Sequence, residues 1–176
     1  MAFHFKQALA MTILAGCAAA ASSCSQQRSL DVRAREVAAS TINFALSEPD
    51  RFTVTQISAP DSVMGDRLIE DQELNVIFGM LHDVSEVIIR RTDNLARVDS
   101  ADSYLIALAN LHLEANNFMR TLMCAPTHTD SFSGWKVRVF CEKALESGDT
   151  LRVMRYCYLT PDGNAVVKTY DFPLIR

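Results

Sequence analysis

The sequence lacks a long apolar run and has little excess of charge of either sign. It has 176 residues, with 17 lysine and arginine against 21 aspartate and glutamate, which gives a formal net charge of −4. A mildly acidic chain has no overall attraction for phosphate backbones, so we do not expect a nucleic-acid partner. Its apolar segment near the start is shorter than the about 20 residues that a membrane-spanning helix requires.

The motifs of common catalytic and metal sites are also missing. We find no glycine-rich phosphate loop, no nucleophile elbow and no His-Glu-x-x-His pair. Cys124 and His128 stand near each other, but zinc needs four ligands, or three and a water, and no second pair has ligand spacing. The sequence therefore predicts no metal and no cofactor, and it points away from an enzyme. A catalytic site assembled from residues that are distant in sequence has no such motif.

What the chain does have is an N-terminal leader. Its first 24 residues carry one charged side chain, Lys6, followed by the apolar segment Ala8 to Leu14 and a run of small residues to Ala21. A basic start, a short apolar segment and a small-residue end are typical of a secretory signal peptide. We therefore expect the chain to be exported.

The end of this leader resembles the lipobox of bacterial lipoproteins. Leu14, Ala15, Gly16 and Cys17 match its aliphatic residue, two small residues and lipid-bearing cysteine in order. The resemblance implies cleavage before Cys17 and a diacylglycerol on its thiol. Cys24, which follows Ala21-Ser22-Ser23, is the alternative lipid attachment site, although it lacks the aliphatic residue.

This resemblance divides the chain into three parts. Residues 1–16 are expected to form the signal peptide, residues 17–28 a lipid-anchored tether, and residues 29–176 a single domain. Neither candidate cysteine is followed by the aspartate that retains lipoproteins at the inner membrane. By resemblance, the expected location is therefore the outer membrane, on its periplasmic side, with surface exposure as an alternative.

Three further cysteines would then lie in an oxidising compartment. Cys141 and Cys157 fall near opposite ends of a predicted hairpin, beyond the roughly 7 Å that a disulfide spans between Cα atoms. We expect buried free thiols. A disulfide between Cys124 and Cys157 is the alternative.

Hydrophobic periodicity predicts the secondary structure. Helices are expected over Leu30 to Leu46, from Asp71 through Ile88, and over Tyr104 to Leu122. Strands are expected over Phe52 to Ile57, Trp135 to Cys141, Leu151 to Leu159 and Ala165 to Phe172, with Ser62 to Ile69 either a strand or a loop.

This order of elements predicts an α+β fold. An N-terminal helix precedes a long antiparallel helix pair, and the pair packs on one face of a three- to four-stranded antiparallel sheet that ends in a β-meander. Together with Gly134-Trp135-Lys136-Val137 and the ending Tyr170-Asp171-Phe172-Pro173-Leu174, the order resembles small lipid-anchored α+β proteins of Gram-negative bacteria, a group with no assigned chemistry.

Pairing the last three strands about their turns separates two sheet faces. One face is apolar, should meet the helices, and includes Val137, Val139, Cys141, Val153, Cys157 and Val167. The other is basic and rich in tyrosine, and Phe140 lies on it among the candidate binding residues Lys136, Arg138, Arg152, Tyr156, Tyr158, Lys168 and Tyr170. This second face is either a contact surface for an envelope protein, a glycan or an anionic lipid, or the ordinary wet face of an antiparallel sheet.

Two polar residues suggest a different kind of site. Arg155 falls on the apolar sheet face in this register, and His112 lies on the last long helix beside Leu108 and Ala115. One interpretation places both in a pocket between sheet and helices, as in the NTF2-like fold, which this chain partly resembles. The other places Arg155 at the sheet rim and His112 at a boundary.

Together these observations predict a lipid-anchored cell-envelope protein, attached to the membrane by its N-terminal lipid. A non-catalytic binding or scaffolding role through the tyrosine-basic face is the leading interpretation. An NTF2-like small-molecule-binding protein or enzyme is the alternative.

Overall fold

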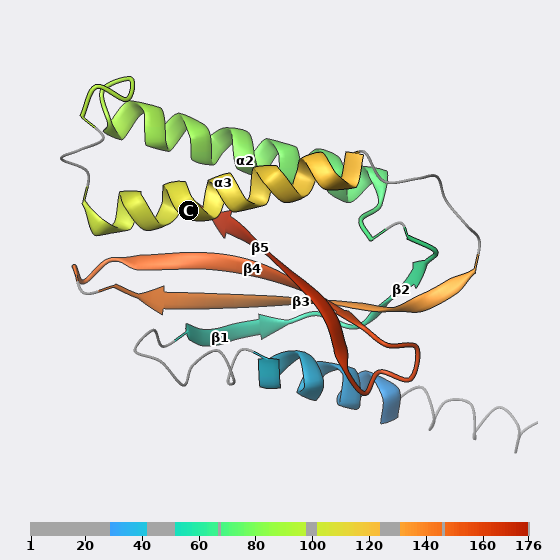
Figure 1. Ribbon diagram of the computed structural model, residues 1–176. Coiled ribbons are helices and arrows are strands. Elements are labelled where there is room, and N and C mark those ends of the chain that lie inside the picture. Colours follow the sequence, from blue (N-terminus) through green and yellow to red (C-terminus); the bar gives the residue numbers. More distant parts are fainter. Residues whose placement is uncertain are drawn as a thin grey trace, which may run out of the picture.

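The described part of the chain has three layers, with a helix below a sheet and a helix pair above it (Figure 1). The computed structural model describes residues 29–41, 52–66, 68–97, 102–123, 131–145 and 147–175. The signal peptide, the tether, Cys17, Cys24 and Cys124 lie outside the described residues. Residues 29–41 are helical, and the later elements are β1 (Phe52–Ile57), β2 (Asp61–Met64), α2 (Asp71–Arg91), α3 (Ser103–Met123), β3 (Phe132–Ala144), β4 (Thr150–Leu159) and β5 (Val166–Leu174).

The predicted α+β class is confirmed, with a sheet of five strands where three to four were expected. Its strands run antiparallel in the order β1-β3-β4-β5, and β2 also pairs with β3. The long β3 makes this possible, because its first residues pair with β2 while residues from Val139 to Lys143 pair with β1. The ambiguous stretch after Pro60 is thus a short strand that ends at Met64.

The turn between β4 and β5 departs from the predicted register. A tight turn at residues 160–164 would place Lys168 opposite Tyr156 and Tyr170 opposite Met154. In the structure Lys168 lies opposite Tyr158, and Tyr170 lies opposite Tyr156, a shift of two residues. The turn is wider than predicted, because the Thr160 amide donates to the Ala165 carbonyl, and a bulge leaves Val167 as an extra residue. Because side chains alternate between the two faces of a strand, a shift of two residues leaves Lys168 and Tyr170 on their predicted face. Val167, expected on the apolar face, is instead 70% exposed.

Local sequence explains where the two long helices begin and end. Glu70 and Glu73 form a capping box at the start of α2, which satisfies amides that have no partner within the helix. At its end the Thr92 hydroxyl donates to the Ile88 carbonyl at 2.7 Å. The Asp102 carboxylate accepts from the Leu105 amide at 2.7 Å, so Asp102 caps α3.

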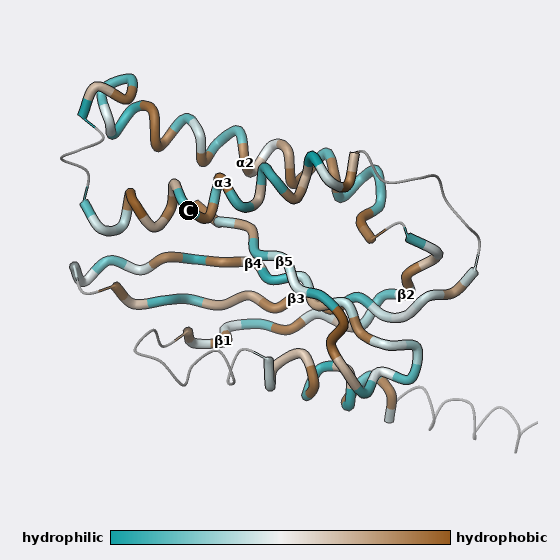
Figure 2. The backbone as a smooth tube through the Cα atoms, in the orientation of Figure 1, coloured by the Kyte–Doolittle hydropathy of each residue, from teal (hydrophilic) through white to brown (hydrophobic). Residues whose placement is uncertain are grey.

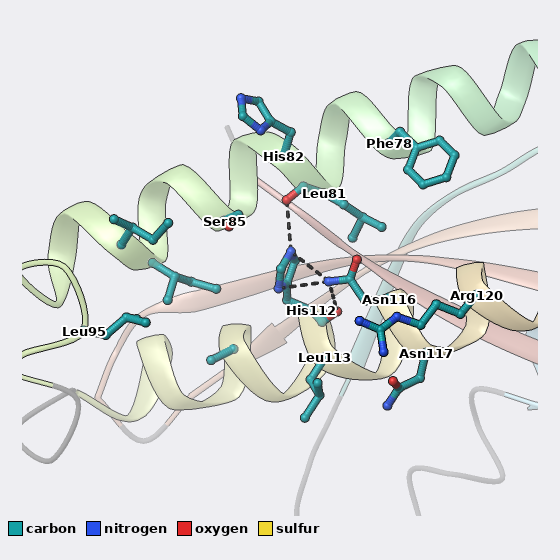
Figure 3. A pocket seen from close by; sticks show the side chains of 13 residues that line it. Phe78, Leu81, His82, Ser85, Leu95, His112, Leu113, Asn116, Asn117 and Arg120 are labelled. Carbon is teal, nitrogen blue, oxygen red and sulfur yellow. Dashed lines mark hydrogen bonds between the residues drawn. The ribbon is translucent and has the colours of Figure 1, made fainter.

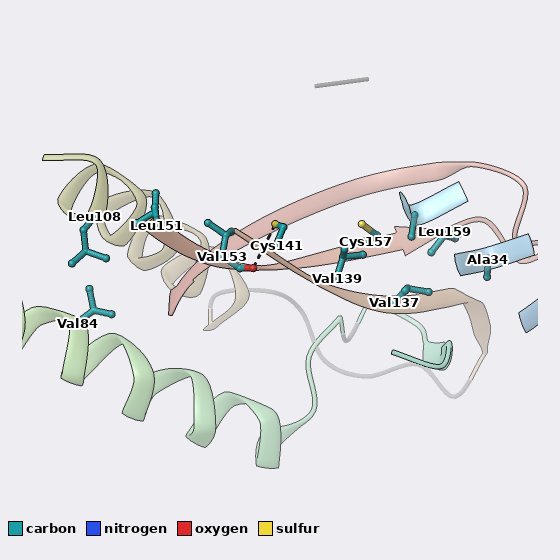
Figure 4. Packing of buried hydrophobic residues seen from close by; sticks show 11 residues of the cluster. Ala34, Val84, Leu108, Val137, Val139, Cys141, Leu151, Val153, Cys157 and Leu159 are labelled. Atoms are coloured by element: carbon teal, nitrogen blue, oxygen red, sulfur yellow. Dashed lines mark hydrogen bonds between the residues drawn. The ribbon is translucent and has the colours of Figure 1, made fainter. Parts of the chain in front are cut away.

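The sheet is covered on both faces, and the helix pair lies on the face that sequence analysis had assigned to solvent. Figure 1 shows α2 and α3 on one side of the sheet and the helix at residues 29–41 on the other. Ala34 and Ala38 of that helix belong to the cluster of Val137, Val139 and Cys157 (Figure 4). The expectation that the helix pair meets the apolar face is therefore wrong over most of the sheet. Val84 and Leu108 of α2 and α3 do join this cluster, together with Leu151 and Val153.

Gly134 shows how closely β3 approaches the end of β4. Its φ of +154° lies at the edge of the region that favours glycine. A Cβ atom at this position would stand 2.1 Å from the Leu159 carbonyl oxygen. The next residue, Trp135, donates its indole N–H to the Pro161 carbonyl at 2.8 Å. A side chain at position 134 would therefore force β3 away from β4.

Candidate functional site

The residues of the predicted binding face lie side by side on the sheet, but the centre of that face is buried. Lys136, Tyr156 and Tyr158 are only 4%, 2% and 4% exposed. They pack beneath α2 and α3 in a cluster with Ile77 and Phe118, among others. The prediction of a solvent-facing patch is therefore wrong for these three residues. Tyrosine rings carry enough apolar surface to form a core when their hydroxyl groups find partners.

The polar ends of these side chains are satisfied inside the structure. The Tyr158 hydroxyl donates to the Leu68 carbonyl at 2.8 Å, and Lys136 Nζ pairs with Glu73 Oε2. Burial, followed by the nearby Glu73 charge, raises the pKa of Tyr156 to about 12. Arg138 lies 3.9 Å from Glu73 and 3.5 Å from Asp61. Glu73 is therefore the shared anionic partner of the buried Lys136 and the partly exposed Arg138.

The remaining members of the predicted face lie nearer its edges. Arg152 is exposed and pairs with Glu142 at 2.8 Å. Lys168 is also exposed, and its Nζ stands 4.9 Å from the centre of the Tyr170 ring. Tyr170 stacks on Phe118 of α3. These residues do not combine with the buried ones into a continuous open surface.

The two candidate pocket residues lie in different parts of the molecule. Arg155 makes two hydrogen bonds of 2.6 Å to the carboxylate of Asp171, its direct neighbour on β5. This hydrogen bonding raises the pKa of the guanidinium. His112 Nε2 instead donates to the Leu81 carbonyl at 3.0 Å. The expected pocket lined by both is not formed among the described residues, because Arg155 faces away from α2 and α3 while His112 joins them.

A groove lies between α2 and α3, and His112 is one of its lining residues. It has a volume of about 690 Å³, and Figure 3 shows side chains from both helices that line it. Among the described residues that line it, Arg120 alone carries a formal charge when histidine is neutral. The lining residues are Phe78, Leu81, His82, Ser85, Ile88, Ile89, Leu95, Ala109, His112, Leu113, Asn116, Asn117 and Arg120.

Large apolar side chains form much of the groove's outer rim. Phe78 and Ile89 of α2 are 42% and 37% exposed, and Leu113 of α3 is 60% exposed. Leu95, in the turn that follows α2, is 57% exposed. No prediction from the sequence covered this surface, because the core stripe of each helix is the stronger pattern. Apolar residues recur along both helices (Figure 2). The available signal was a second set of apolar positions on α2, about 100° around the helix from Ile77 and Leu81.

The predicted free thiols are confirmed for two cysteines. Cys141 and Cys157 are buried and form no disulfide. Burial, as the largest cause, raises the pKa of each thiol to about 11. Because a thiolate is the nucleophilic form, these two residues should react slowly with alkylating reagents in the folded protein. Neither residue therefore has the environment of a reactive or catalytic cysteine.

The buried thiols should make the protein less stable in alkaline solution. Unfolding returns each thiol from a pKa of about 11 to an ordinary value near 8.5. Below that value both states are protonated and stability is full; as pH rises toward 11 the unfolded state ionises first, and stability falls. We expect a loss of roughly 1–3 kcal/mol per thiol between about pH 8.5 and 11.

Urea unfolding at a series of pH values measures this loss. The variant Cys141→Val, Cys157→Val should show a flatter decline than the parent chain over the same range. Equal slopes for the two proteins would contradict the assignment to these thiols.

Two further kinds of functional feature, a metal site and a membrane-spanning helix, are absent from the described residues. Within the described ranges there is no group of three or more histidine, cysteine, aspartate or glutamate residues placed to hold a metal ion. Among those same residues, no helix has both the length and the apolar content needed to cross a membrane. Comparison of the chain with protein-family models, with curated proteins and with solved structures finds no match.

Proposed function

We propose that this chain is a lipid-anchored protein of the cell envelope that acts as a non-catalytic binding or scaffolding module. The observation that carries the proposal is Leu14-Ala15-Gly16-Cys17 at the end of a leader with a basic start and an apolar segment. Its lipid would hold the domain at the periplasmic side of the outer membrane. The tether before residue 29 is short, so the domain works close to the bilayer.

The groove between α2 and α3 is the contact surface in this proposal. It takes the place of the tyrosine-basic face, whose central residues are buried. Its apolar rim and its single charged lining residue favour a partner that presents apolar side chains. The groove also lies on the opposite side of the sheet from the helix at residues 29–41, which follows the tether (Figure 1). A domain held through that helix can therefore turn the groove away from its anchored side.

A binding role is favoured over catalysis by how the polar groups are used. His112 donates from Nε2 to the Leu81 carbonyl, and its Nδ1 accepts from the Asn116 amide. Lys136 and Glu73 satisfy each other beneath α2. General acid–base chemistry needs such a group within reach of a substrate, and these groups are committed to the fold.

The anchor is tested by mass spectrometry of the mature N-terminus of the full chain, produced in a Gram-negative host. We expect the first residue to be Cys17 with acyl chains attached, and the protein to enter the detergent phase on partitioning. Cys17→Ala should abolish both signals, while Cys24→Ala, the matched control, should leave them unchanged. Acylation at Cys24 would move the site, and a mature protein without acyl chains would refute the anchor.

A further inference from the structure

We infer that the groove between α2 and α3 receives a second copy of this chain, giving a twofold-symmetric dimer. In that dimer the two helix pairs stack face to face, with each helix antiparallel to its counterpart. The inference rests on the proposed function in one respect, since it names the partner of the same surface. A twofold dimer requires a surface that is complementary to itself after rotation, and the outer face of the helix pair meets this requirement.

The outer face of α3 carries a stripe with heptad spacing. Ile106, Leu113 and Arg120 are successive seventh residues, so they lie nearly in line along the helix. Ile106 and Leu113 are 50% and 60% exposed. In an antiparallel pairing centred on Leu113, this leucine meets its own copy. Each Ile106 then lies under the aliphatic stem of the partner's Arg120, an arrangement that suits the amphipathic arginine side chain.

The exposed apolar residues of α2 lie on either side of the level of Leu113. Phe78 and Ile89 are eleven residues apart, which is about three helical turns or 16 Å, so both face the same way. The contact between His112 and the Leu81 carbonyl shows that Leu113 lies within about a turn of the midpoint between them. A single twofold axis therefore pairs Phe78 with the partner's Ile89 and Leu113 with its own copy.

The size of this face also suits a second copy. Each helix has 21 residues, so the pair presents a face of about 30 by 20 Å. With side-chain relief, that approaches the about 800 Å² per partner of a standard interface.

Cysteine cross-linking tests the predicted axis. Leu113→Cys, in the full chain in the membranes of a Gram-negative host, should form a disulfide-linked dimer on mild oxidation. The matched control is Val76→Cys, since Val76 is 62% exposed on α2 but does not line the groove. The parent chain controls for the native cysteines. We expect at least about tenfold more linked dimer from the first variant than from either control, and equal yields would overturn the inference.

A second measurement separates dimerisation from other binding. Sedimentation equilibrium of the purified protein in detergent should show a dimer for the parent and for Val76→Lys. Leu113→Lys should weaken association by at least about tenfold, while circular dichroism reports whether it keeps its fold. A monomeric parent whose groove instead cross-links to another envelope protein would refute the dimer and leave the proposed function standing. A dimeric protein whose mature N-terminus carries no acyl chains would support the dimer and refute the lipid anchor.

Discussion

Glu73→Gln is expected to lower the free energy of unfolding by about 3–5 kcal/mol, because it leaves a buried lysine without its counter-ion. Lys136 is 4% exposed and pairs with this carboxylate beneath α2. Arg138 also loses an anionic neighbour at 3.9 Å. Urea unfolding, followed by the fluorescence of Trp135, the chain's single tryptophan, measures the change.

Two companion variants make this result specific. The double variant Glu73→Leu, Lys136→Met should regain most of the lost stability, because apolar side chains of similar volume can replace a buried ion pair at little cost. Glu142→Gln breaks the exposed pair with Arg152 and should cost no more than about 1 kcal/mol. If Glu73→Gln proved as mild as Glu142→Gln, the buried pair would not hold α2 on the sheet.

Phe172→Ala should also cost about 3–5 kcal/mol, through the lost burial of the ring and the cavity that it leaves. Phe172 is fully buried on β5. Its ring meets the Tyr156 ring edge-on, with 5.5 Å between the ring centroids, and its centroid lies 5.8 Å from that of the Phe118 ring of α3. It therefore links the sheet to the helix layer, and its loss should raise the hydrogen-exchange rates of amides in α3 as well as lower the unfolding midpoint.

A position on the same strand provides the control for Phe172. Val167→Ala removes an apolar side chain that is 70% exposed at the β5 bulge, so it should change stability by less than about 0.5 kcal/mol. Phe172→Leu, which keeps much of the volume, should fall between the two variants. A loss for Phe172→Ala as small as that for Val167→Ala would contradict the packing role of the ring.

The buried cluster explains why the tyrosine-basic pattern misleads at the level of sequence. Alternation with a period of two showed correctly that Lys136, Tyr156 and Tyr158 share a sheet face. A strand with lysine and tyrosine on one side normally turns that side to water. Here the ammonium group of Lys136 meets Glu73, which is 63 residues away in the chain, and the Tyr158 hydroxyl meets the Leu68 carbonyl. Partners so distant in sequence leave no local pattern.

The sequence by itself determined the helices and the strands other than β2, their order, and most of the side chains that share a sheet face, because backbone geometry sets the periods of 3.6 and 2 residues. It also placed Cys141 and Cys157 too far apart to form a disulfide, and both are free. Only the tertiary structure decided which face the helix pair covers and where the β5 bulge falls. It also decided that α2 and α3 leave an apolar groove between them. These outcomes depend on contacts between residues far apart in the chain, whose free energies compete across the whole fold and which no local periodicity encodes.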